Sequence, residues 1–519
     1  YRYRSSKSCE IYYIEITQEK VEDILVSLFD KEKLRNIIIA IVLILFSRIF
    51  LTSLFEFTLN KKVLIQIVAS VIYLLLFNSK DSAKIPRNAF LLIVIFGSFI
   101  SVVKPVQYGL DEESHLPNVI SVSDSPIFKY SDEKLEDYDS VFGYDALRNP
   151  GKKSSQFWYN VEHKDSKIRG TRVGFDNPAF LPNAIGWSIG RLISKKVYVS
   201  YYLGRIFEVI AFAILAYLAL KISKVFREAI YLFSTFPAVL YIIAGYHYDY
   251  LYFGASLIAL ALLTNVLSEK NKVDKKYAIA FQCTTLLFAF SKFPFILTGS
   301  LLSVLPNRYY KDKKMRSFSS LLFLLNLFIS FIYVGIIKLF PSGSSISGEG
   351  PGLFYFLTHP LPLLRTLFLA PHGIINDFIS DPLKYVSEKS AFLIAASIFT
   401  FFFILFIIIL RNKIELPKFF KYYSLLLLLG IAILIIVAIS GDPRVYHTGD
   451  IVVGGVQGRY YYYILMFLPL YFGTWFHKKV GIADIAQSED SNFDISLQYA
   501  LIFLNILTIS IGIYTQIQG

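Results

Sequence analysis

The sequence predicts an all-α polytopic membrane protein with two long loops on one side of the membrane. Of its 519 residues, 55% are hydrophobic and only 18% are charged, whereas soluble domains average about 25% charged residues. The apolar residues fall in blocks of about 18–25, the length with which a helix crosses a hydrocarbon core of roughly 30 Å. Aromatic residues reach 17%, as is common where rings line membrane interfaces. This composition excludes soluble enzymes, disulfide scaffolds and low-complexity tails.

Thirteen apolar segments predict about thirteen crossings. Residues 1–33 form a predicted N-terminal tail, and residues 481–519 carry the last crossing. A hairpin of two short helices is expected at 277–306, because Ser-Lys-Phe-Pro at 291–294 interrupts the apolar sequence and turns at membrane depth. In chain order, the segments are 34–56, 63–79, 88–106, 200–222, 228–244, 248–268, 277–290, 293–306, 317–340, 390–410, 422–440, 459–476 and 495–515.

The distribution of basic residues predicts the orientation. Loops on one side hold 21 Lys and Arg residues, whereas the short loops on the other side hold five. Because positively charged loops stay in the cytoplasm, the first set is predicted to be cytoplasmic. The N-terminus then lies inside and the C-terminus outside. The net charge of +13 therefore indicates contact with anionic lipid headgroups rather than nucleic-acid binding.

Two long loops, at 107–199 and 341–389, are predicted to face the outside. The first loop ends in an apolar stretch at 178–193. A crossing there would invert every later basic loop, so we expect an interfacial helix instead. The stretch at 351–369 in the second loop is interrupted by Pro and His, and it is a second candidate for an interfacial helix.

The stretch after the segment at 88–106 contains the strongest candidate for catalysis. Asp111, Glu112 and Glu113 are consecutive, and His115 follows. Adjacent carboxylates repel one another and an apolar neighbour raises the pKa of such a group, which suits a general base. A solvated acidic start of the loop is the alternative. The same three carboxylates are candidate ligands for a divalent cation such as Mg²⁺ or Mn²⁺.

Further polar residues lie at the predicted outer ends of other segments, where an ionisable group is costly and is a candidate for function. Arg205 and Glu208 have the i,i+3 spacing of a structural ion pair, which is the alternative to substrate binding. Snorkelling towards headgroups is the alternative for Arg459, and capping of a helix break is the alternative for Lys292. The candidate substrate-binding residues are His115, Arg205, Asp249, Lys292, Gln457, Arg459 and Tyr460.

Cations and carboxylates on one side of the membrane suit the transfer of a sugar from a lipid-phosphate donor. Arg and Lys neutralise a phosphate through charge-assisted hydrogen bonds. A carboxylate beside them accepts the proton of an incoming hydroxyl, and the anomeric centre inverts in a single displacement. No glycine-rich nucleotide-binding motif or Walker motif occurs in the sequence.

From Lys104 onward, the chain resembles the bacterial membrane family called domain of unknown function 2142, which is similar to a branch of the GT-C glycosyltransferase superfamily. The matching residues keep their order over residues 88–480. They are Asp111-Glu112-x-x-His115, Pro178-x-x-Leu181-Pro182-x-Ala184-Ile185-Gly186, Gly204-Arg205, Pro237, Asp249, Ser291-Lys292-x-Pro294 and Val456-Gln457-Gly458-Arg459-Tyr460.

The resemblance implies a GT-C-like core at 88–480, with the spans at 34–87 as additions. It implies a polyprenyl-phosphate-linked sugar as donor, undecaprenyl phosphate being the bacterial carrier. Asp111 is then the general base, Glu112 the second catalytic acid, and His115 an aid to acceptor or phosphate binding. Asp249 departs from the family, which tends to have small residues where this chain has His247 and tyrosines.

The expected partners follow from this resemblance. They are a polyprenyl-phosphate-sugar donor, a cell-surface glycan or lipid-linked acceptor, membrane lipids and a glycosyltransferase that makes the donor. The expected location is the bacterial cytoplasmic membrane, with the active site facing outside. No nucleic acid is expected as a partner.

Two other classes of membrane protein remain open. A lipid-linked oligosaccharide polymerase or ligase also has many spans, but its essential basic residues would lie in the loop at 341–389. A transporter or flippase for a lipid-linked glycan would place charged residues near the bilayer midplane and show inverted repeats of broken helices.

Overall fold

The structure is a computed structural model of the chain. Within the described ranges, the regular structure is helical, and two isolated backbone bridges join Glu162 to Lys196 and Val273 to Tyr310. Most of the predicted N-terminal tail and about half of the loop at 107–199 lie outside these ranges, so the predictions for those residues stay predictions. The structure describes residues 31–51, 61–78, 81–104, 106, 108–109, 111–124, 141, 158–164, 177–338, 351–380, 391–480 and 490–518.

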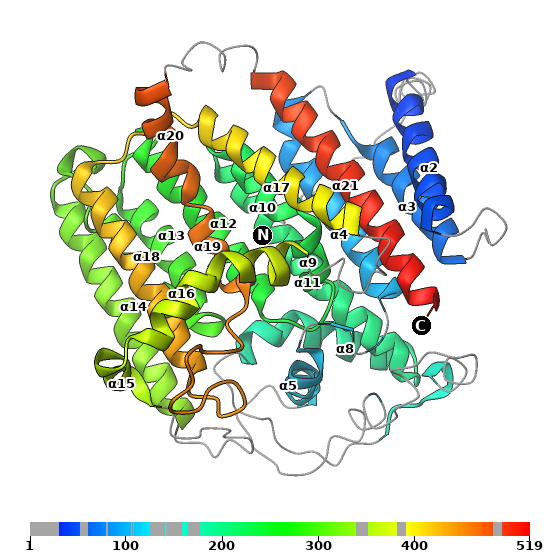
Figure 1. Cartoon of the computed structure of the whole chain (residues 1–519), viewed down its shortest axis with the longest axis horizontal. Helices are drawn as coiled ribbons and strands as arrows, with labels where there is room; N and C mark the ends of the chain where they lie inside the picture. Colours follow the sequence, from blue (N-terminus) through cyan, green and yellow to red (C-terminus); the bar gives the residue numbers. More distant parts are fainter. Residues whose placement is uncertain are drawn as a thin grey trace, which may run out of the picture.

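Helices follow one another along the described chain (Figure 1). Those written η are 3₁₀-helices, except η8, which is a π-helix. In chain order they are α2 (Lys31–Leu51), α3 (Lys61–Leu76), η2 (Ser82–Lys84), α4 (Ile85–Val103), α5 (Glu112–Asp124), η4 (Asn177–Phe180), α8 (Leu181–Ile193), α9 (Val197–Ile222), α10 (Arg227–Thr235), α11 (Pro237–Ile243), α12 (Asp249–Leu267), α13 (Lys275–Leu286), η5 (Leu287–Phe290), η6 (Phe293–Leu302), η7 (Asn307–Tyr309), α14 (Lys314–Lys338), α15 (Gly352–Thr358), α16 (Leu361–Gly373), η8 (Ile374–Ile379), α17 (Ala391–Arg411), α18 (Lys418–Ile439), η11 (Gly458–Tyr461), α19 (Tyr462–Leu465), α20 (Leu468–Val480) and α21 (Asp490–Gln518).

Several helices in the described part of the chain are long and apolar enough to cross a membrane. Their number is seven, or eight if a bent pair of helices counts as one span. The sequence therefore predicts the class correctly, an integral membrane protein built of helices, but a count of about thirteen crossings is not confirmed. The seven are Ile85–Val103, Val197–Ile222, Asp249–Leu267, Lys314–Ile337, Ile394–Arg411, Lys418–Ile439 and Asp494–Ile513.

The other predicted segments coincide with helices outside this set. Those at 34–56 and 63–79 fall on α2 and α3, and the predicted hairpin falls on α13, η5 and η6. The segment at 228–244 is broken into α10 and α11 at Phe236, because Pro237 has no N–H to donate to the preceding turn and instead occupies the first turn of α11. The segment at 459–476 is divided among η11, α19 and α20.

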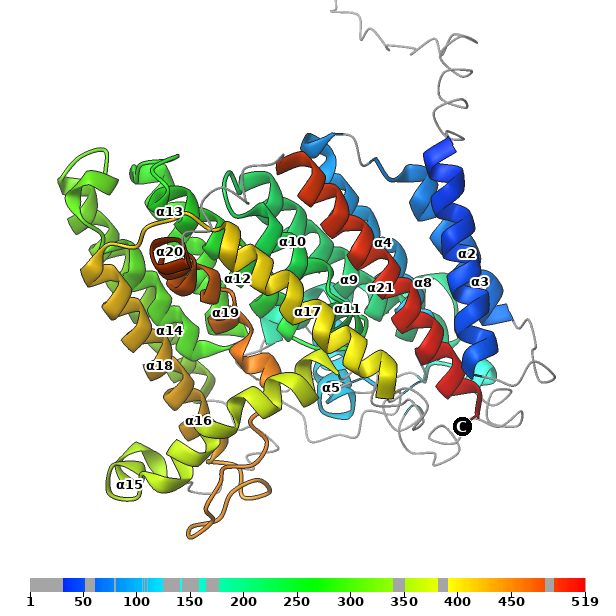
Figure 2. The same cartoon turned by 45° about the horizontal axis from the view of Figure 1, so that its top comes forward.

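Two shorter helical units stand where interfacial helices are expected. In the first loop, η4 and α8 form the stretch at 178–193. In the second, α15 is followed by α16 and η8 after a bend of 94°. Figures 1 and 2 show α16 lying across the neighbouring α14 and α18 rather than along them.

The central helix is α12, whose residues are all buried, as expected for a helix that lacks a polar face. It packs on α9, which in turn packs on α4 and α8. Two glycines bring α8 close to α9. A Cβ atom added to Gly186 would lie 2.4 Å from the carbonyl oxygen of Leu203, and one added to Gly190 would lie 2.3 Å from the Cα of Ser200. The middle and the C-terminal part of α8 are thus fixed against the first turns of α9.

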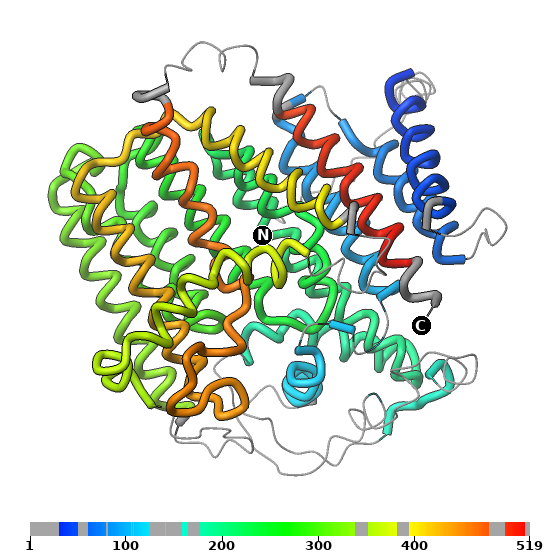
Figure 3. Tube along the Cα trace, in the orientation of Figure 1, coloured from blue at the N-terminus to red at the C-terminus, as the bar shows by residue number. Residues whose placement is uncertain are grey.

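The first and last described helices lie side by side. Figure 3 shows the blue α2 and the red α21 next to each other. Asn36 of α2 donates a hydrogen bond to the hydroxyl of Tyr499 in α21 at 2.9 Å. The N-terminal helices thus pack on the C-terminal helix, at the side of the bundle away from α13 and α14.

Candidate active site

Asp249 is the centre of a buried charge cluster. It is the first residue of α12, and its side chain is completely buried. Its Oδ1 lies 3.1 Å from Lys292 Nζ, and its Oδ2 lies 2.9 Å from Arg459 Nε. Lys292 comes from the break between η5 and η6, and Arg459 belongs to η11. Three segments that are far apart in the sequence therefore meet at one carboxylate.

Asp111 lies at the open side of this cluster. Its side chain is 46% exposed, and its Oδ2 lies 2.5 Å from Arg459 Nη2 and 3.7 Å from His247 Nε2. The φ angle of Asp111 is 53°, in the left-handed region that is strained for a residue other than glycine. Arg459 thus bridges two carboxylates, the half-exposed Asp111 and the buried Asp249.

Two buried histidines lie on the side of the cluster that faces Asp111. The ring centroids of His115 and His247 are 4.7 Å apart, and Phe180 and Tyr248 pack against His115. The backbone N–H of Asp249 donates to Nδ1 of His247 at 3.0 Å. Burial lowers the pKa of both histidines, and for His115 the neighbouring His247 adds to this effect. Both imidazoles are therefore neutral at neutral pH.

The first two carboxyl groups of the acidic run do not have the raised pKa values that the sequence suggests. Contact with the His247 imidazole and the charge of Arg459 hold the pKa of Asp111 below its usual range, against the effect of burial. Burial would raise the pKa of Glu112, but the guanidinium of Arg205 outweighs burial and lowers it. The expected upward shift is wrong for both, because each carboxylate has a cation within hydrogen-bonding distance.

Lys292 is held between two tyrosine rings. Its Nζ lies 4.6 Å from the ring centroid of Tyr248 and 4.1 Å from that of Tyr460, distances typical of cation–π contacts. Burial would lower the pKa of Lys292, but the carboxylate of Asp249 outweighs burial and raises it. The structure thus joins Tyr460 to the cluster through Lys292, which stays charged.

Arg459 and Gln457 retain polar atoms that the fold does not use. Arg459 Nη1 and Gln457 Oε1 are buried and have no hydrogen-bond partner among the described residues. A buried polar atom without a partner costs roughly 1–3 kcal/mol. The Nη1 atom of Arg459 belongs to the guanidinium group that contacts the half-exposed carboxylate of Asp111 through Nη2.

Arg205 is fully buried and faces Glu112 rather than the open side. Its Nε donates to Oε1 of Glu112 at 2.9 Å and its Nη2 donates to Oε2 at 2.7 Å. Its Nη1 donates to the carbonyl oxygens of Ser101 and Lys104, each at 3.0 Å. This pair ties the start of α5 to α4 and α9. The contacts favour a positioning role for both residues over the substrate-binding role expected for Arg205 and the catalytic role expected for Glu112.

The i,i+3 pair of Arg205 with Glu208 is not formed. Glu208 Oε2 instead accepts hydrogen bonds from Asn183 Nδ2 at 2.7 Å and from the backbone N–H of His247 at 2.9 Å. Lys104 Nζ donates to the carbonyl oxygen of Tyr241 at 3.0 Å, and burial, together with the nearby Arg205, lowers the pKa of Lys104 to about 7.

Sequence reasoning did not select Lys104, Asn183 or His247 as site residues. His247 lies two residues before Asp249 in the same polar stretch, and Asn183 lies within the motif at 178–186. Both could therefore have been selected if every polar residue of those motifs had been included. Lys104 ends an apolar segment, and only the fold shows that it turns inward.

Three side chains of the cluster have the arrangement of metal ligands. Asp111, His115 and His247 each offer one ligand atom, and these atoms lie within 4.8 Å of one another. The predicted ligand set of Asp111, Glu112 and Glu113 is not brought together, because Glu112 binds Arg205 and Glu113 is exposed. Asp111 is thus the one member of the predicted set that the structure retains.

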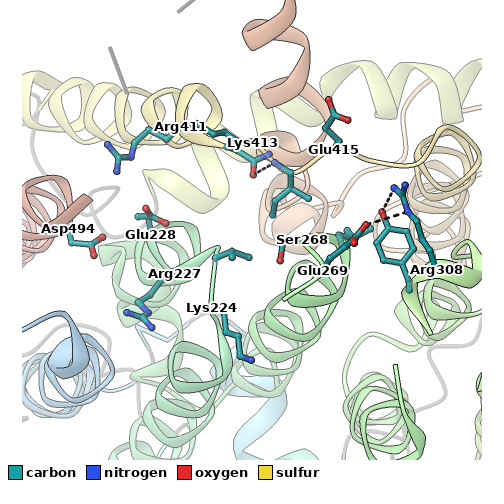
Figure 4. Close-up of a pocket in the computed structure, with 15 residues that line it drawn as sticks. Lys224, Arg227, Glu228, Ser268, Glu269, Arg308, Arg411, Lys413, Glu415 and Asp494 are labelled. Atoms are coloured by element: carbon teal, nitrogen blue, oxygen red, sulfur yellow. Dashed lines mark hydrogen bonds and ion pairs between the residues drawn. The ribbon is translucent and has the colours of Figure 1, made fainter. Parts of the chain in front are cut away.

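A cavity of about 930 Å³ lies away from this cluster (Figure 4). The cluster is at the N-terminal end of α12, whereas Leu267 and Ser268 at the C-terminal end of that helix line the cavity. None of the predicted site residues lines it. Its charged lining residues are Lys224, Arg227, Glu228, Glu269, Arg308, Arg411, Lys413, Glu415 and Asp494.

The fold and the site define a class, a helical membrane protein that holds a buried network of charged residues at one end of its central helix. Residues 90–468 match the family model described as "Predicted membrane protein (DUF2142)". The chain belongs to this family, as the motifs in the sequence indicate. No curated protein and no solved structure matches the chain.

Proposed function

We propose that the protein is a GT-C-type membrane glycosyltransferase. It transfers a sugar from a polyprenyl-phosphate-linked donor to a cell-surface glycan or lipid-linked acceptor, with inversion at the anomeric carbon. The observation that carries the proposal is the bridge that Arg459 makes between the half-exposed Asp111 and the buried Asp249. A carboxylate at the open side with cations behind it supplies the two elements that this transfer needs.

The donor phosphate binds at the cations. Arg459 Nη1 lacks a hydrogen-bond partner among the described residues, so a phosphate oxygen can accept from it while Nη2 stays on Asp111. Lys292 adds a second positive charge from the other side of Asp249. Both cations are almost fully buried, and charge-assisted hydrogen bonds to phosphate are strong where water is excluded.

Asp111 activates the acceptor, and its role rests on its position at the open side and on its ionised state rather than on a raised pKa, since His247 and Arg459 keep its pKa low. Its carboxylate takes the proton of the acceptor hydroxyl as the hydroxyl oxygen forms a bond to the anomeric carbon. The bond from that carbon to the phosphate oxygen breaks, and its electron pair leaves with the polyprenyl phosphate, whose charge Arg459 and Lys292 neutralise. Asp249 touches neither substrate in this scheme, because it is completely buried and holds the two cations in place.

The side of the membrane follows from the positions of the basic residues. The cavity at the C-terminal end of α12 is lined by Lys224, Arg308 and Arg411, which belong to loops assigned to the cytoplasm by their positive charge. The cluster lies at the other end of α12 and thus faces outside in this orientation. The donor is then a lipid such as an undecaprenyl-phosphate sugar, supplied by a separate glycosyltransferase in the bacterial cytoplasmic membrane.

The position of the charges favours this proposal over its rivals. A polymerase or ligase is expected to use basic residues of the second long loop, yet Arg365, in the described part of that loop, is exposed and is not part of the cluster. A transporter or flippase is expected to hold charges near the middle of its spans, whereas Asp249 begins α12 and Asp111 precedes α5.

The proposal predicts that Asp111→Asn abolishes transfer while the protein still folds. The amide keeps the shape of the side chain but cannot take a proton, so the rate should fall by roughly 10²-fold or more. The measurement is the release of undecaprenyl phosphate from a panel of undecaprenyl-phosphate sugars, followed by mass spectrometry in proteoliposomes that contain the purified chain and an envelope glycan extract.

Glu113→Gln is the matched control. Glu113 lies two residues away and is exposed, so it should keep the activity of the unchanged chain. Activity that persists in Asp111→Asn, or that falls equally in both variants, would remove Asp111 from the reaction.

A further inference from the structure

The cluster contains a group of three side chains, two histidines and one aspartate, that the proposed transfer does not by itself require. His115 and His247 are both buried, and the carboxylate of Asp111 faces them from the open side. His247 Nε2 is buried, lies 3.7 Å from Asp111 Oδ2, and has no hydrogen-bond partner among the described residues. The imidazole nitrogen and the carboxylate oxygen thus face each other at a distance longer than a hydrogen bond, which leaves room for an ion between them.

We propose that Asp111, His115 and His247 bind one divalent transition-metal ion, of which Zn²⁺ is the leading member. Two imidazoles and one carboxylate, with further positions left open, form the donor set of catalytic zinc sites. Imidazole nitrogen is a poor ligand for Mg²⁺ and a good one for Zn²⁺. The histidines therefore change the identity of the metal from the Mg²⁺ or Mn²⁺ that three carboxylates suggest.

The distances are compatible with such an ion after a small closure. In a tetrahedral zinc site with bonds of about 2.0–2.1 Å, ligand atoms lie about 3.4 Å apart. The separation of 3.7 Å between Asp111 Oδ2 and His247 Nε2 is close to that value, and the full set lies within 4.8 Å. Asp111 is half exposed, so its side chain is able to move towards the two buried rings.

A second layer of contacts supports His247 as a ligand. Metal-bound histidines usually give their other ring nitrogen a partner that fixes the ring. Here Nδ1 lies 3.0 Å from the backbone nitrogen of Asp249 and 3.5 Å from its Oδ2. Either tautomer of His247 thus has a partner at Nδ1. Metal binding at Nε2 requires the proton to lie on Nδ1, 3.5 Å from Oδ2 of Asp249, in place of the hydrogen bond that Nδ1 accepts from the backbone N–H of Asp249 when no metal is bound.

The charge of the neighbourhood assigns the metal a role, and this step rests on the proposed function. Asp111 and Asp249 balance Arg459 and Lys292, so a bound divalent ion leaves the cluster with an excess of positive charge. An anionic ligand in the open coordination positions offsets that excess. The phosphate of the lipid donor is such a ligand, and the metal would hold it beside Arg459. Asp111 would bind the ion through Oδ2, the oxygen that faces His247, and its other oxygen would accept the proton of the acceptor hydroxyl.

The test measures metal binding by the full chain without any substrate. The protein is purified in nanodiscs through an affinity tag that contains no histidine, treated with EDTA, and dialysed against dilute ZnCl₂. The amount of zinc bound per chain is then measured by elemental mass spectrometry over a range of ZnCl₂ concentrations. We expect about one Zn²⁺ per chain, and at least tenfold weaker binding in His247→Gln and in Asp111→Asn, since loss of even a supporting contact typically costs 10–100-fold.

His447→Gln is the matched control. His447 lies near Asp450 at 3.7 Å in an exposed loop and should leave zinc binding unchanged. X-ray absorption spectroscopy of the zinc-loaded, unchanged chain gives a measurement that does not depend on how the variants fold. Two imidazole ligands are expected in its spectrum. A spectrum without imidazole, absence of stoichiometric zinc, or equal binding in all variants would overturn the proposal.

The outcome separates this inference from the proposed function. Zinc binding that depends on His247 supports the metal site even if no sugar donor is ever turned over. Transfer of sugar that survives EDTA in a chain that binds no zinc would retain the glycosyltransferase and discard the metal.

Discussion

At the scale of single residues, the site depends on Arg459 more than on any other side chain. Its Nε lies 2.9 Å from Asp249 and its Nη2 lies 2.5 Å from Asp111, while Nη1 remains for a ligand. A planar guanidinium can serve three directions at once, whereas an ammonium is a compact point charge. Gly458 supports this position, because a Cβ there would lie 2.1 Å from the carbonyl oxygen of Gly373.

We therefore expect Arg459→Lys to weaken binding of the donor even though it keeps the charge. Lysine cannot reach both carboxylates and a phosphate together, so the affinity should fall at least tenfold, or about 1.4 kcal/mol. The measurement is microscale thermophoresis of undecaprenyl phosphate with the purified chain in nanodiscs.

Arg444→Lys provides the control for this prediction. Arg444 lies in the same connection, is exposed and pairs with Asp442 at 2.6 Å, so its replacement should leave the affinity unchanged. An equal affinity for undecaprenyl phosphate in Arg459→Lys and the unchanged chain would argue against a phosphate at Nη1.

Four residues of the site were predictable from the sequence, but His247 and the roles of the residues were not. The structure brings together Asp111, Asp249, Lys292 and Arg459. Each of them lies at the end of an apolar segment, where a charged side chain is costly unless it is paired with an opposite charge. The sequence cannot show that Glu112 turns to Arg205, since that contact joins residues 93 positions apart. The sequence also cannot show whether the pKa of a carboxyl group is raised or lowered, because the shift depends on which cation lies nearest in the fold.

At the scale of elements, the site is held in place by the contact of α8 with α9. Gly186 and Gly190 allow the two backbones to touch, and small residues at helix contacts are the usual means of close approach in membranes. The same contact brings Asn183 to Glu208, which in turn accepts from the backbone N–H of His247. A substitution at this contact should therefore change the position of His247 in the cluster.

Gly190→Ala should destabilise the protein. The added Cβ would lie 2.3 Å from the Cα of Ser200, which belongs to the backbone and cannot turn away. Overpacking of this kind costs roughly 1–3 kcal/mol, more than the 0.8–1.0 kcal/mol or so that alanine gains over glycine in a helix. We expect a lower apparent melting temperature in a thermal scan of the detergent-solubilised chain.

Gly335→Ala is the control, because it makes the same substitution in a helix at a position where the added methyl group contacts no other helix of the described chain. Gly335 lies in α14, and a Cβ there meets nothing within 4 Å among the described atoms. This variant should be as stable as the unchanged chain or slightly more stable. If Gly190→Ala proves equally stable, the close packing of α8 on α9 is not what fixes the site.

The sequence predicts the existence of helices better than their number of crossings. The segments at 88–106 and 422–440 each correspond to one helix, α4 and α18, because nothing divides the apolar stretch before Lys104 or the stretch at 422–439. The segments at 228–244 and 277–306 are also apolar, but Pro237 and the pair Ser291–Lys292 divide them. Hydropathy measures how well a segment partitions into lipid, but it does not show where a helix breaks.

At the scale of the whole molecule, the two ends of the bundle differ in charge and in shape. One end holds the cluster around Asp249, and the other holds the cavity lined by Arg308, Arg411 and Lys413. The helices α9 and α12 run between the two ends, so these ends are expected on opposite sides of the membrane. This separation places the proposed chemistry away from the basic loops.

Labelling of single cysteines tests this orientation directly. Cys9 and Cys283 are first replaced by serine, and a cysteine is introduced at Glu113 near the cluster or at Lys413 near the cavity, both of which are exposed. A maleimide that cannot cross membranes should label the first variant in intact bacterial cells and the second only after the cells are opened. The positively charged loops predict this result, because moving so many cations across a membrane is unfavourable. If the Lys413 variant is labelled in intact cells and the Glu113 variant is not, the cluster faces the cytoplasm. The sugar donor would then be drawn from the inner leaflet, and the product would have to be exported afterwards.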